Sequence, residues 1–213
     1  MQTRNPPKKF ITSEIFFMDG FLSEEECSHI LEELDVVLWQ PSLTYRKQKN
    51  GTYQNVLSPF RVSGTAHQEW FSNELNAMLI RIEERLQKLF DLDIANLECW
   101  QATNYPQKGK FDYHLDAGYW SNHYAGERIL TFLLYLNTPL KGGGTHFRAL
   151  DVDVEARSGR LLVWNNLFPN GDCNYRMIHS ATPLLRGKKT TLVTWQRQKK
   201  FRTQKSQFQR SKS

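Results

Sequence analysis

The stretch LECWQATNYPQKGKFDYHLD, residues 97–116, decides the fold that this sequence predicts. Before it, apolar residues recur at helical spacing, and from its start they alternate as they do in β-strands. We expect two strands here, separated by a turn at Gly109. Because successive side chains of a strand point to opposite faces, His114 and Asp116 share a face and can bind one metal ion.

Two helices and a hairpin are expected before this stretch. Ser23 and Glu26 form a capping-box pattern that begins an amphipathic helix, and residues 70–90 carry a longer apolar stripe. Between them, residues 43–60 are polar and contain Asn50-Gly51, a strong signal for a β-hairpin. This hairpin is either an arm that covers a bound molecule or a solvated turn.

Further short strands are expected after the opening stretch, at residues 129–137, 160–164 and 190–196. Turns that contain glycine and proline separate them. Many short strands preceded by helices predict a mainly β fold with flanking helices, of the α+β class. The architecture that fits is a β-sandwich or jelly-roll barrel with the helices packed on one outer face.

Length and composition favour a single domain. The chain has 213 residues, of which 39% are hydrophobic, enough for one core without disulfides. Cys27, Cys99 and Cys173 are odd in number, widely spaced and without a C-x-x-C pair. We therefore expect a reducing, cytoplasmic compartment and no thiolate zinc site. No signal peptide and no membrane-spanning run is expected.

The net charge of +6 is concentrated at the C-terminal end. Seven basic residues and no acidic residue lie from residue 197 to residue 213, which leaves residues 1–196 at −1. A nearly neutral body is not a nucleic-acid-binding surface. We expect a flexible lead-in over residues 1–13, a folded domain over 14–197 and a basic, disordered tail over 198–213. The alternative for the tail is docking on an acidic partner or on nucleic acid.

A distant histidine and a lysine complete the candidate site. We expect His179 on the wall of the barrel opposite His114 and Asp116, so that two imidazoles and one carboxylate face one metal ion. This set is the facial triad of non-heme Fe(II) oxygenases, which leaves positions open for reactants. Lys189 follows His179 across a turn, so we expect its ammonium near the same end of the cavity, where it can bind a carboxylate.

Strand alternation predicts the other walls of this pocket. Thr131 and Tyr135 share one face of their strand, and Lys189 and Trp195 share one face of the last strand. One ammonium, two hydroxyl groups and apolar walls suit a small dicarboxylate.

Ordered motifs along the chain carry a resemblance to a known family. They are Arg61-Val62-Ser63, Asn104-Tyr105-x-x-x-Gly109-x-Phe111-x-x-His114-x-Asp116, Arg128-x-x-Thr131-x-x-x-Tyr135-Leu136-Asn137, Gly143-Gly144-Thr145-x-Phe147, Gly159-Arg160 and His179-x-x-x-Pro183-x-x-x-Gly187-x-Lys189. Over residues 14–197 the chain resembles the prolyl 4-hydroxylase family of Fe(II)- and 2-oxoglutarate-dependent dioxygenases. The resemblance implies a double-stranded β-helix fold, which is a cupin-like jelly roll.

The resemblance also implies roles for individual positions. The implied iron ligands are His114, Asp116 and His179, and the implied contacts of 2-oxoglutarate are Lys189, Tyr105, Tyr135 and Thr131. The implied substrate contacts are Arg128, Phe111 and Trp195. The implied cofactors are Fe(II), 2-oxoglutarate and O2, with ascorbate as the reductant.

The reaction implied is hydroxylation of an aliphatic carbon, in the first place that of a prolyl residue in a peptide or protein. Phe111 stands where peptide-hydroxylating members often have tyrosine, and Arg148 stands where proline is familiar. These departures support a second hypothesis, hydroxylation of a free amino acid or another small metabolite with the same cofactors. A third hypothesis is a catalytically silent binding or sensor domain whose His/Asp/His cluster is structural or holds zinc.

Overall fold

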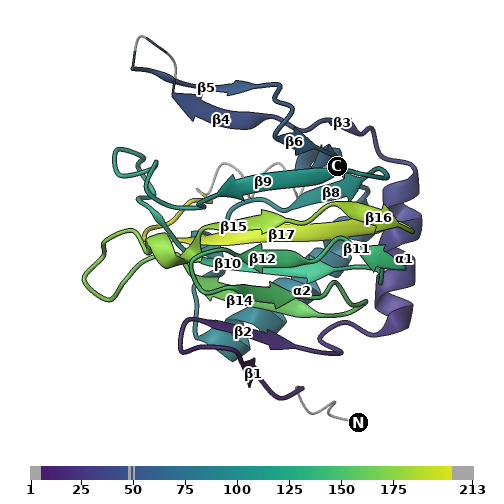
Figure 1. Cartoon of the computed structure of the whole chain (residues 1–213). Coiled ribbons are helices and arrows are strands. Elements are labelled where there is room, and N and C mark those ends of the chain that lie inside the picture. Colours follow the sequence, from purple (N-terminus) through teal and green to yellow (C-terminus); the bar gives the residue numbers. More distant parts are fainter. Residues whose placement is uncertain (1–5, 48, 50, 203–213) are drawn as a thin grey trace.

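The computed structural model describes residues 6–47, 49 and 51–202, and two β-sheets make up most of it (Figure 1). The larger sheet has the strand order β1 (Lys9–Phe10), β2 (Ile15–Met18), β14 (Leu161–Asn165), β10 (Arg128–Tyr135), β17 (Lys189–Arg197), β8 (Gln101–Tyr105), β7 (Gly64–His67) and β3 (Gln40–Pro41). The smaller sheet has the order β13 (Val152–Val154), β12 (Thr145–Phe147), β15 (His179–Ala181), β9 (Lys110–His114) and β6 (Arg61–Val62). Two short pairs flank the sheets, β4 (Thr44–Lys47) with β5 (Tyr53–Val56) and β11 (Lys141–Gly142) with β16 (Leu184–Arg186). All of these described strand pairs are antiparallel.

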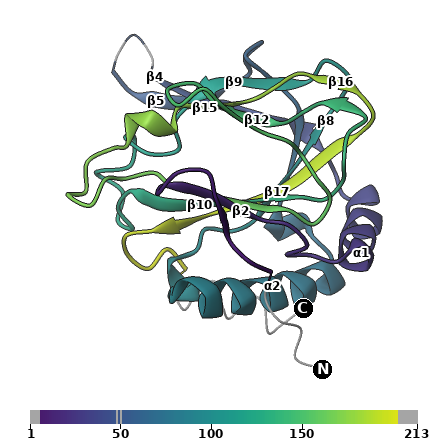
Figure 2. The ribbon, with the colours of Figure 1, turned by 60° about the horizontal axis from the view of Figure 1, so that its bottom comes forward.

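The two sheets face each other around an apolar core. Tyr135 and Trp164 from the larger sheet and Phe147 from the smaller sheet belong to one cluster and are at most 2% exposed. A second cluster joins the larger sheet to α1 (Glu24–Asp35) and α2 (Asn73–Phe90). Figure 2 shows α2 lying across the outer face of the larger sheet. The predicted jelly roll with helices on one outer face is confirmed.

Both helices begin at serine caps. The Ser23 side chain accepts a hydrogen bond from the Glu26 backbone N–H at 3.0 Å, and Glu26 accepts one from the Ser23 N–H at 2.8 Å, which confirms the capping box. α2 begins after the predicted residue 70, because Ser72 caps it and the 3-10 turn Gln68–Trp70 precedes it. Further 3-10 turns are Ile94–Asn96 and Tyr175–Met177. No helix among the described residues is long and apolar enough to cross a membrane.

The predicted hairpin is confirmed as the pair β4–β5. Its register runs from Thr44 opposite Val56 to Lys47 opposite Tyr53. The predicted turn falls partly on residues 48 and 50, which lie outside the described residues. Figure 1 shows the hairpin projecting from the barrel beside β6 and β9.

Both predicted ends of the domain need correction. The flexible lead-in expected over residues 1–13 does not hold for Lys9–Phe10, which pair with β2. The disordered tail expected from residue 198 does not hold for its first residues, because Arg202 is 8% exposed and forms a buried ion pair with Glu83. Composition could not reveal this partner, which lies far away along the chain. Residues 1–5 and 203–213 of the two predicted segments lie outside the described residues.

Strand register brings the two candidate histidine ligands together. β9 and β15 are neighbours in the smaller sheet, and His114 lies directly opposite His179. The two histidines therefore lie on one wall of the barrel, and the prediction of opposite walls is wrong. Lys189 begins β17 in the larger sheet, which forms the facing wall. Local patterns do not encode which distant strands pair, so the sequence placed the right residues on the wrong walls.

Candidate metal centre and its cavity

The three candidate metal ligands converge inside the barrel. The ring centroids of His114 and His179 lie 4.2 Å apart. Asp116 follows the end of β9, and its carboxylate oxygens lie 4.0 Å from His114 Nε2 and 3.9 Å from His179 Nε2. The three ligand atoms lie within 4.8 Å of one another, close enough for one ion to contact all three.

Hydrogen bonds to the backbone set the tautomer of both imidazoles. His114 Nδ1 lies 2.9 Å from the Asp112 carbonyl, and His179 Nδ1 lies 2.8 Å from the Met177 carbonyl. A carbonyl oxygen can only accept, so each Nδ1 carries a hydrogen and donates it. In the neutral ring each Nε2 then keeps its lone pair for a ligand. Proteins usually orient metal-binding histidines through such a second hydrogen bond.

Protonation states in the cluster favour binding of a cation. Burial, together with the neighbouring His179, lowers the pKa of His114 to about 3, so its imidazole is neutral at pH 7. Burial alone would raise the pKa of Asp116, but the two neighbouring histidines and Arg128 hold that pKa below its usual value. A neutral imidazole and an ionised carboxylate are the states that metals require of their ligands. The set of two histidines and one carboxylate fits Fe(II).

Two buried polar side chains hold the Asp116 carboxylate. Thr131 Oγ1 donates to Asp116 Oδ2 at 2.7 Å, and Asn166 Nδ2 donates to Thr131 Oγ1 at 2.8 Å. Both Thr131 and Asn166 are at most 2% exposed, so water does not compete for these bonds. Thr131 lines the cavity, yet its hydroxyl hydrogen is committed to the candidate ligand. Its contact with 2-oxoglutarate stays a prediction, and no sequence pattern had singled out Asn166.

Lys189 is a buried cation on the facing wall. It is 2% exposed, and its Nζ lies 4.4 Å from the Tyr105 ring centroid and 5.9 Å from that of Tyr135. Its hydrogen bond to the Gly144 carbonyl is long, at 3.5 Å, and no carboxylate in the described ranges forms an ion pair with it. Burial lowers the pKa of Lys189 to about 7. Because a buried ammonium without an anion is costly, this position is suited to a ligand carboxylate.

Two phenols flank this ammonium. Tyr135 is fully buried, and its hydroxyl lies 2.6 Å from Thr145 Oγ1. Burial raises the pKa of both Tyr105 and Tyr135, so both phenols are protonated at pH 7. A protonated phenol can donate to an anion. Thr145 had no predicted role, although its Gly-Gly-Thr motif had been noticed.

One cavity of about 480 Å³ connects these groups. Its volume lies in the range of about 300–1,000 Å³ that is usual for small-molecule sites. Strand alternation holds as predicted, since the cavity is lined from β10 by Thr131 and Leu133 and from β17 by Lys189, Thr191, Val193 and Trp195. The candidate metal ligands and Lys189 are therefore accessible to one bound molecule.

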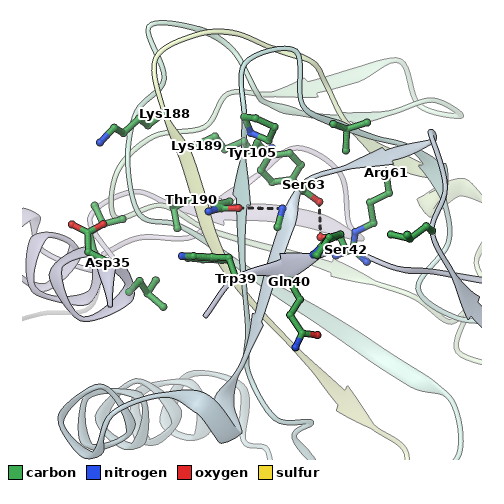
Figure 3. A pocket seen from close by; sticks show the side chains of 18 residues that line it. Asp35, Trp39, Gln40, Ser42, Arg61, Ser63, Tyr105, Lys188, Lys189 and Thr190 are labelled. Atoms are coloured by element: carbon green, nitrogen blue, oxygen red, sulfur yellow. Dashed lines mark hydrogen bonds between the residues drawn. The ribbon is translucent and has the colours of Figure 1, made fainter. Parts of the chain in front are cut away.

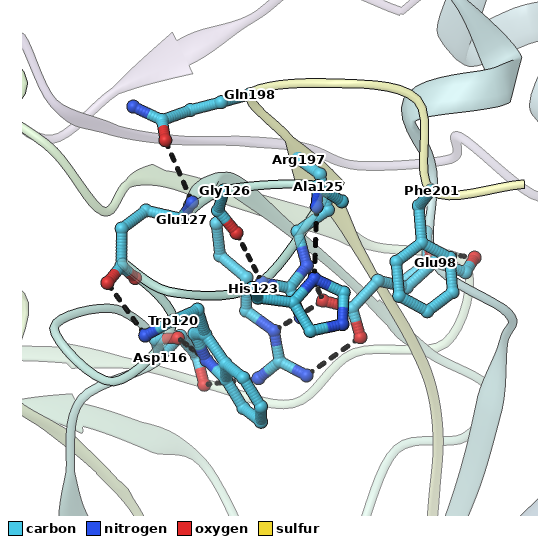
Figure 4. A network of polar contacts seen from close by, with 12 residues as sticks. Glu98, Asp116, Trp120, His123, Ala125, Gly126, Glu127, Arg197, Gln198 and Phe201 are labelled. Atoms are coloured by element: carbon cyan, nitrogen blue, oxygen red, sulfur yellow. Dashed lines mark hydrogen bonds and ion pairs between the residues drawn. The ribbon is translucent and has the colours of Figure 1, made fainter.

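A buried ion-pair network borders the cavity (Figure 4). Glu98 accepts hydrogen bonds from Arg128 at 2.6 and 2.8 Å and lies 2.6 Å from Arg197 Nε. The Arg128 guanidinium lies 3.6 Å from the Trp195 ring centroid and 4.0 Å from Asp116. The structure thus brings both predicted residues, Arg128 and Trp195, beside the metal cluster. Glu98 and Arg197 had not been predicted, although a glutamate within an apolar strand pattern was a signal.

Phe111 packs directly on the metal cluster. Its ring stacks on His114 with centroids 3.6 Å apart and an interplanar angle of 18°. The Arg61 guanidinium lies 4.5 Å from the Phe111 ring centroid and donates to the Leu43 carbonyl at 2.9 Å. The wall beside His114 is therefore aromatic and carries no hydroxyl group. Arg61 had been noticed only as part of the Arg-Val-Ser motif.

The base of the hairpin adds to the same cavity, which Leu43, Thr44, Tyr45 and Asn55 help to line. The Tyr45 ring stacks on Trp120 with centroids 5.0 Å apart. Trp120 lies four positions after Asp116 and donates its indole N–H to the Asp116 carbonyl at 3.3 Å. This contact favours the hypothesis of a covering arm over that of a solvated turn.

The fold and the site define a class of protein, a jelly-roll oxygenase with a His/Asp/His metal centre. Residues 100–197 match the model of the 2OG-Fe(II) oxygenase superfamily. The matched range contains the three candidate ligands and Lys189. These residues therefore form an oxygenase domain of that superfamily.

Within this class the chain is similar to prolyl 4-hydroxylases, as the motifs had predicted. It is 34% identical over 142 residues to prolyl 4-hydroxylase subunit alpha-1 of Gallus gallus, covering 64% of this chain and 27% of the relative. It is 30% identical over 174 residues to subunit alpha-2 of Caenorhabditis elegans, covering 76% of this chain and 31% of the relative. The chain thus spans less than a third of the length of these curated relatives.

Solved structures agree on the fold. The viral collagen prolyl hydroxylase of Paramecium bursaria Chlorella virus-1, in a 2OG complex, has a TM-score of 0.66 at 19% identity, covering 87% of this chain and 96% of that one. A Pseudomonas putida prolyl-4-hydroxylase has a TM-score of 0.57 at 18% identity, covering 88% and 94%. These similarities confirm the predicted double-stranded β-helix.

Proposed function

We propose that the protein is an Fe(II)- and 2-oxoglutarate-dependent dioxygenase that hydroxylates an aliphatic carbon of a prolyl residue in a peptide or protein. One observation carries the proposal. The cavity that contains the His114, Asp116 and His179 cluster also contains the buried ammonium of Lys189, which lacks a carboxylate partner among the described residues. A metal site together with a receptor for a carboxylate suits a chelating dicarboxylate.

The side chains of this chain would bind and orient the reactants. His114, Asp116 and His179 would hold Fe(II), and Lys189 with the phenol of Tyr105 would bind the distal carboxylate of 2-oxoglutarate. When bound, iron, 2-oxoglutarate and O2 together supply the oxidation, which yields succinate, carbon dioxide and a hydroxylated substrate. The apolar walls between the sheets keep water from the reacting groups. Ascorbate as the reductant stays a prediction.

A peptide substrate is supported by the mouth of the cavity. Leu43 and Tyr45 of the hairpin base and Trp120 of the loop border it from separate segments, which suits an extended chain. The names of the relatives and a structural neighbour in complex with a peptide fragment of hypoxia inducible factor support the same class. The second candidate, a free amino acid or small metabolite, is supported by Phe111, whose ring lacks the hydroxyl group common in peptide-hydroxylating members.

The decisive experiment combines binding with turnover. We expect anaerobic calorimetry to detect 2-oxoglutarate binding in the presence of Fe(II), and we expect succinate release with proline-rich peptides. Activity with an amino-acid panel but not with peptides would favour the second candidate. Bound zinc, with no consumption of 2-oxoglutarate after iron reconstitution, would favour a silent binding domain. His179→Ala is the control and should abolish iron-dependent turnover.

We also propose a cytoplasmic location. The support is that Cys27, Cys99 and Cys173 are free thiols in the structure, as is common in reducing compartments. Fractionation of cells that express the full chain would test this. Recovery of the protein in a secretory fraction would contradict it.

A further inference from the structure

A second cavity lies beside the candidate active site (Figure 3). Its volume is about 700 Å³, against about 480 Å³ for the cavity that holds the metal cluster. It opens between β3 and β6, each of which is the last strand of its sheet. The reaction proposed above uses none of the residues that belong to this second cavity alone.

The two cavities are contiguous. Both are lined by Gln40 and Pro41 of β3, Arg61 of β6, Tyr105 and Lys189. A molecule that has one unit in the reaction cavity can therefore continue across this shared rim into the second cavity. Because the second cavity lies between two strand edges, an extended chain fits it better than a compact ligand.

The lining of the second cavity suits a proline-rich segment. Trp39, Leu57, Val62 and Pro106 provide an aromatic and apolar surface. Leu57 is 69% exposed and Val62 is 42% exposed, so this surface is open to a partner. Grooves with aromatic walls recognise the polyproline II helix, whose conformation is already extended and costs little entropy to bind.

Hydrogen bonds hold the rim between the cavities in place. Ser63 Oγ donates to Ser42 Oγ at 2.8 Å, and Ser42 lies 2.6 Å from Thr65 Oγ1. Ser42 and Thr65 are buried. The Gly64 N–H donates to Asn104 Oδ1 at 3.1 Å, and a Cβ at Gly64 would collide with that oxygen. A rim that is already ordered loses little freedom when a segment binds across it.

We propose that the second cavity is a docking site for the part of a proline-rich substrate that flanks the hydroxylated residue. The proposal rests on the prolyl hydroxylase function given above and deepens it. The reacting proline occupies the cavity with the metal cluster, and neighbouring residues of the same chain cross the rim of Pro41 and Arg61 to pack on Trp39 and Leu57.

Binding of peptides of two lengths to the iron-free full chain tests this docking site. The peptides share one central proline-rich sequence, and at about 3.1 Å per residue six residues span about 19 Å and sixteen span about 50 Å. We expect the longer peptide to bind about tenfold more tightly, since its second contact is intramolecular. In Trp39→Ala and in Leu57→Ser this advantage should fall to about onefold. Trp39→Phe should retain most of it.

Leu140→Ala is the matched control, because Leu140 is 73% exposed and lies outside both cavities. We expect it to keep the full advantage of the longer peptide. Circular dichroism would verify that each variant is folded, and Leu57→Ser alters an exposed side chain that the fold does not need. In turnover assays the advantage should appear as a lower KM for the longer peptide.

Each outcome separates this proposal from the proposed function. Equal affinity of both peptides for the wild-type chain would overturn the docking site, whether or not either peptide is hydroxylated. An advantage that survives in both Trp39→Ala and Leu57→Ser would overturn it too. A length advantage that depends on Trp39, with no turnover of any peptide after iron reconstitution, would keep the docking site and refute the hydroxylase.

Discussion

Lys189 is the single residue whose ionisation connects the structure to cosubstrate binding. Burial lowers its pKa to about 7, so the ammonium is largely charged below pH 7 and largely neutral above it. A bound carboxylate favours the charged form and raises this pKa, so above pH 7 binding must take up a proton. We expect the Kd of 2-oxoglutarate, measured by anaerobic calorimetry, to rise with pH above 7, by at most about tenfold per pH unit.

The matched control at this position is Lys189→Arg, because arginine stays charged at all these pH values. Its Kd for 2-oxoglutarate should change much less with pH. Lys189→Ala should raise the Kd by about tenfold to a hundredfold at neutral pH, since it removes a charge-assisted hydrogen bond. The same pH profile in the wild type and in Lys189→Arg would assign the titration to another group.

Thr131 acts on the metal through Asp116. In Thr131→Val the Asp116 carboxylate loses its donor at 2.7 Å, and the amide of Asn166 loses its acceptor. Loss of such a supporting contact typically weakens metal affinity by about tenfold to a hundredfold. We expect this increase in the Kd of Co(II) for Thr131→Val, measured by calorimetry.

Thr131→Ser separates positioning from packing, because serine keeps the hydroxyl group and loses only a methyl group. It should bind Co(II) nearly as the wild type does. If Thr131→Val also binds Co(II) with unchanged affinity, the hydrogen bond does not position Asp116.

At the scale of elements, the segment after β17 fastens the sheet to α2. Arg202 donates to Glu83 at 2.7 and 2.8 Å and to the Glu98 carbonyl at 2.8 Å. Glu83 also accepts from the indole N–H of Trp100 at 2.9 Å, and all of these groups are buried. In Arg202→Ala a buried carboxylate loses its counter-ion, so we expect the free energy of unfolding to fall by about 3–5 kcal/mol in urea denaturation.

Lys200→Ala is the comparison for this prediction. Lys200 pairs with Asp93 at 3.9 Å, and its side chain is 74% exposed. Exposed pairs contribute about 0–1 kcal/mol, so this variant should unfold at nearly the wild-type urea concentration. Similar small effects in both variants would show that the Arg202 ion pair does not anchor the segment.

At the scale of the whole molecule, the fold does not depend on the metal. Two apolar clusters, one between the sheets and one beneath the helices, form the core without it. A metal ion that binds only the folded chain still stabilises it, by about 2.7 kcal/mol at a concentration one hundred times its Kd. We expect Co(II) to raise the Tm of the metal-free protein by about 5–10 °C in a thermal scan.

His179→Ala removes one ligand and should lose most of this thermal shift, while the metal-free Tm reports whether the variant is folded. An equal shift in His179→Ala would place the ion elsewhere. Failure of the metal-free wild type to show a cooperative transition would contradict the independence of the core.

Particular elements show how far the sequence could be interpreted. The capping box at Ser23, the alternation that places Thr131 and Lys189 in the cavity and the pairing of the hairpin all follow from local chemistry, and each was predictable. The Glu98–Arg128–Arg197 network was not, because its members come from strands far apart along the chain. The same applies to Arg202, whose partner lies on α2.

The sequence by itself determined the class of fold, the ligand set and the buried lysine, because periodicity and motif spacing depend only on neighbours along the chain. Only the tertiary structure decided that His114 and His179 pair across adjacent strands, that the Thr131 hydroxyl serves Asp116 and that a second cavity opens beside Arg61. These depend on which distant strands become neighbours. That choice is made by packing of the whole core and not by any local stretch.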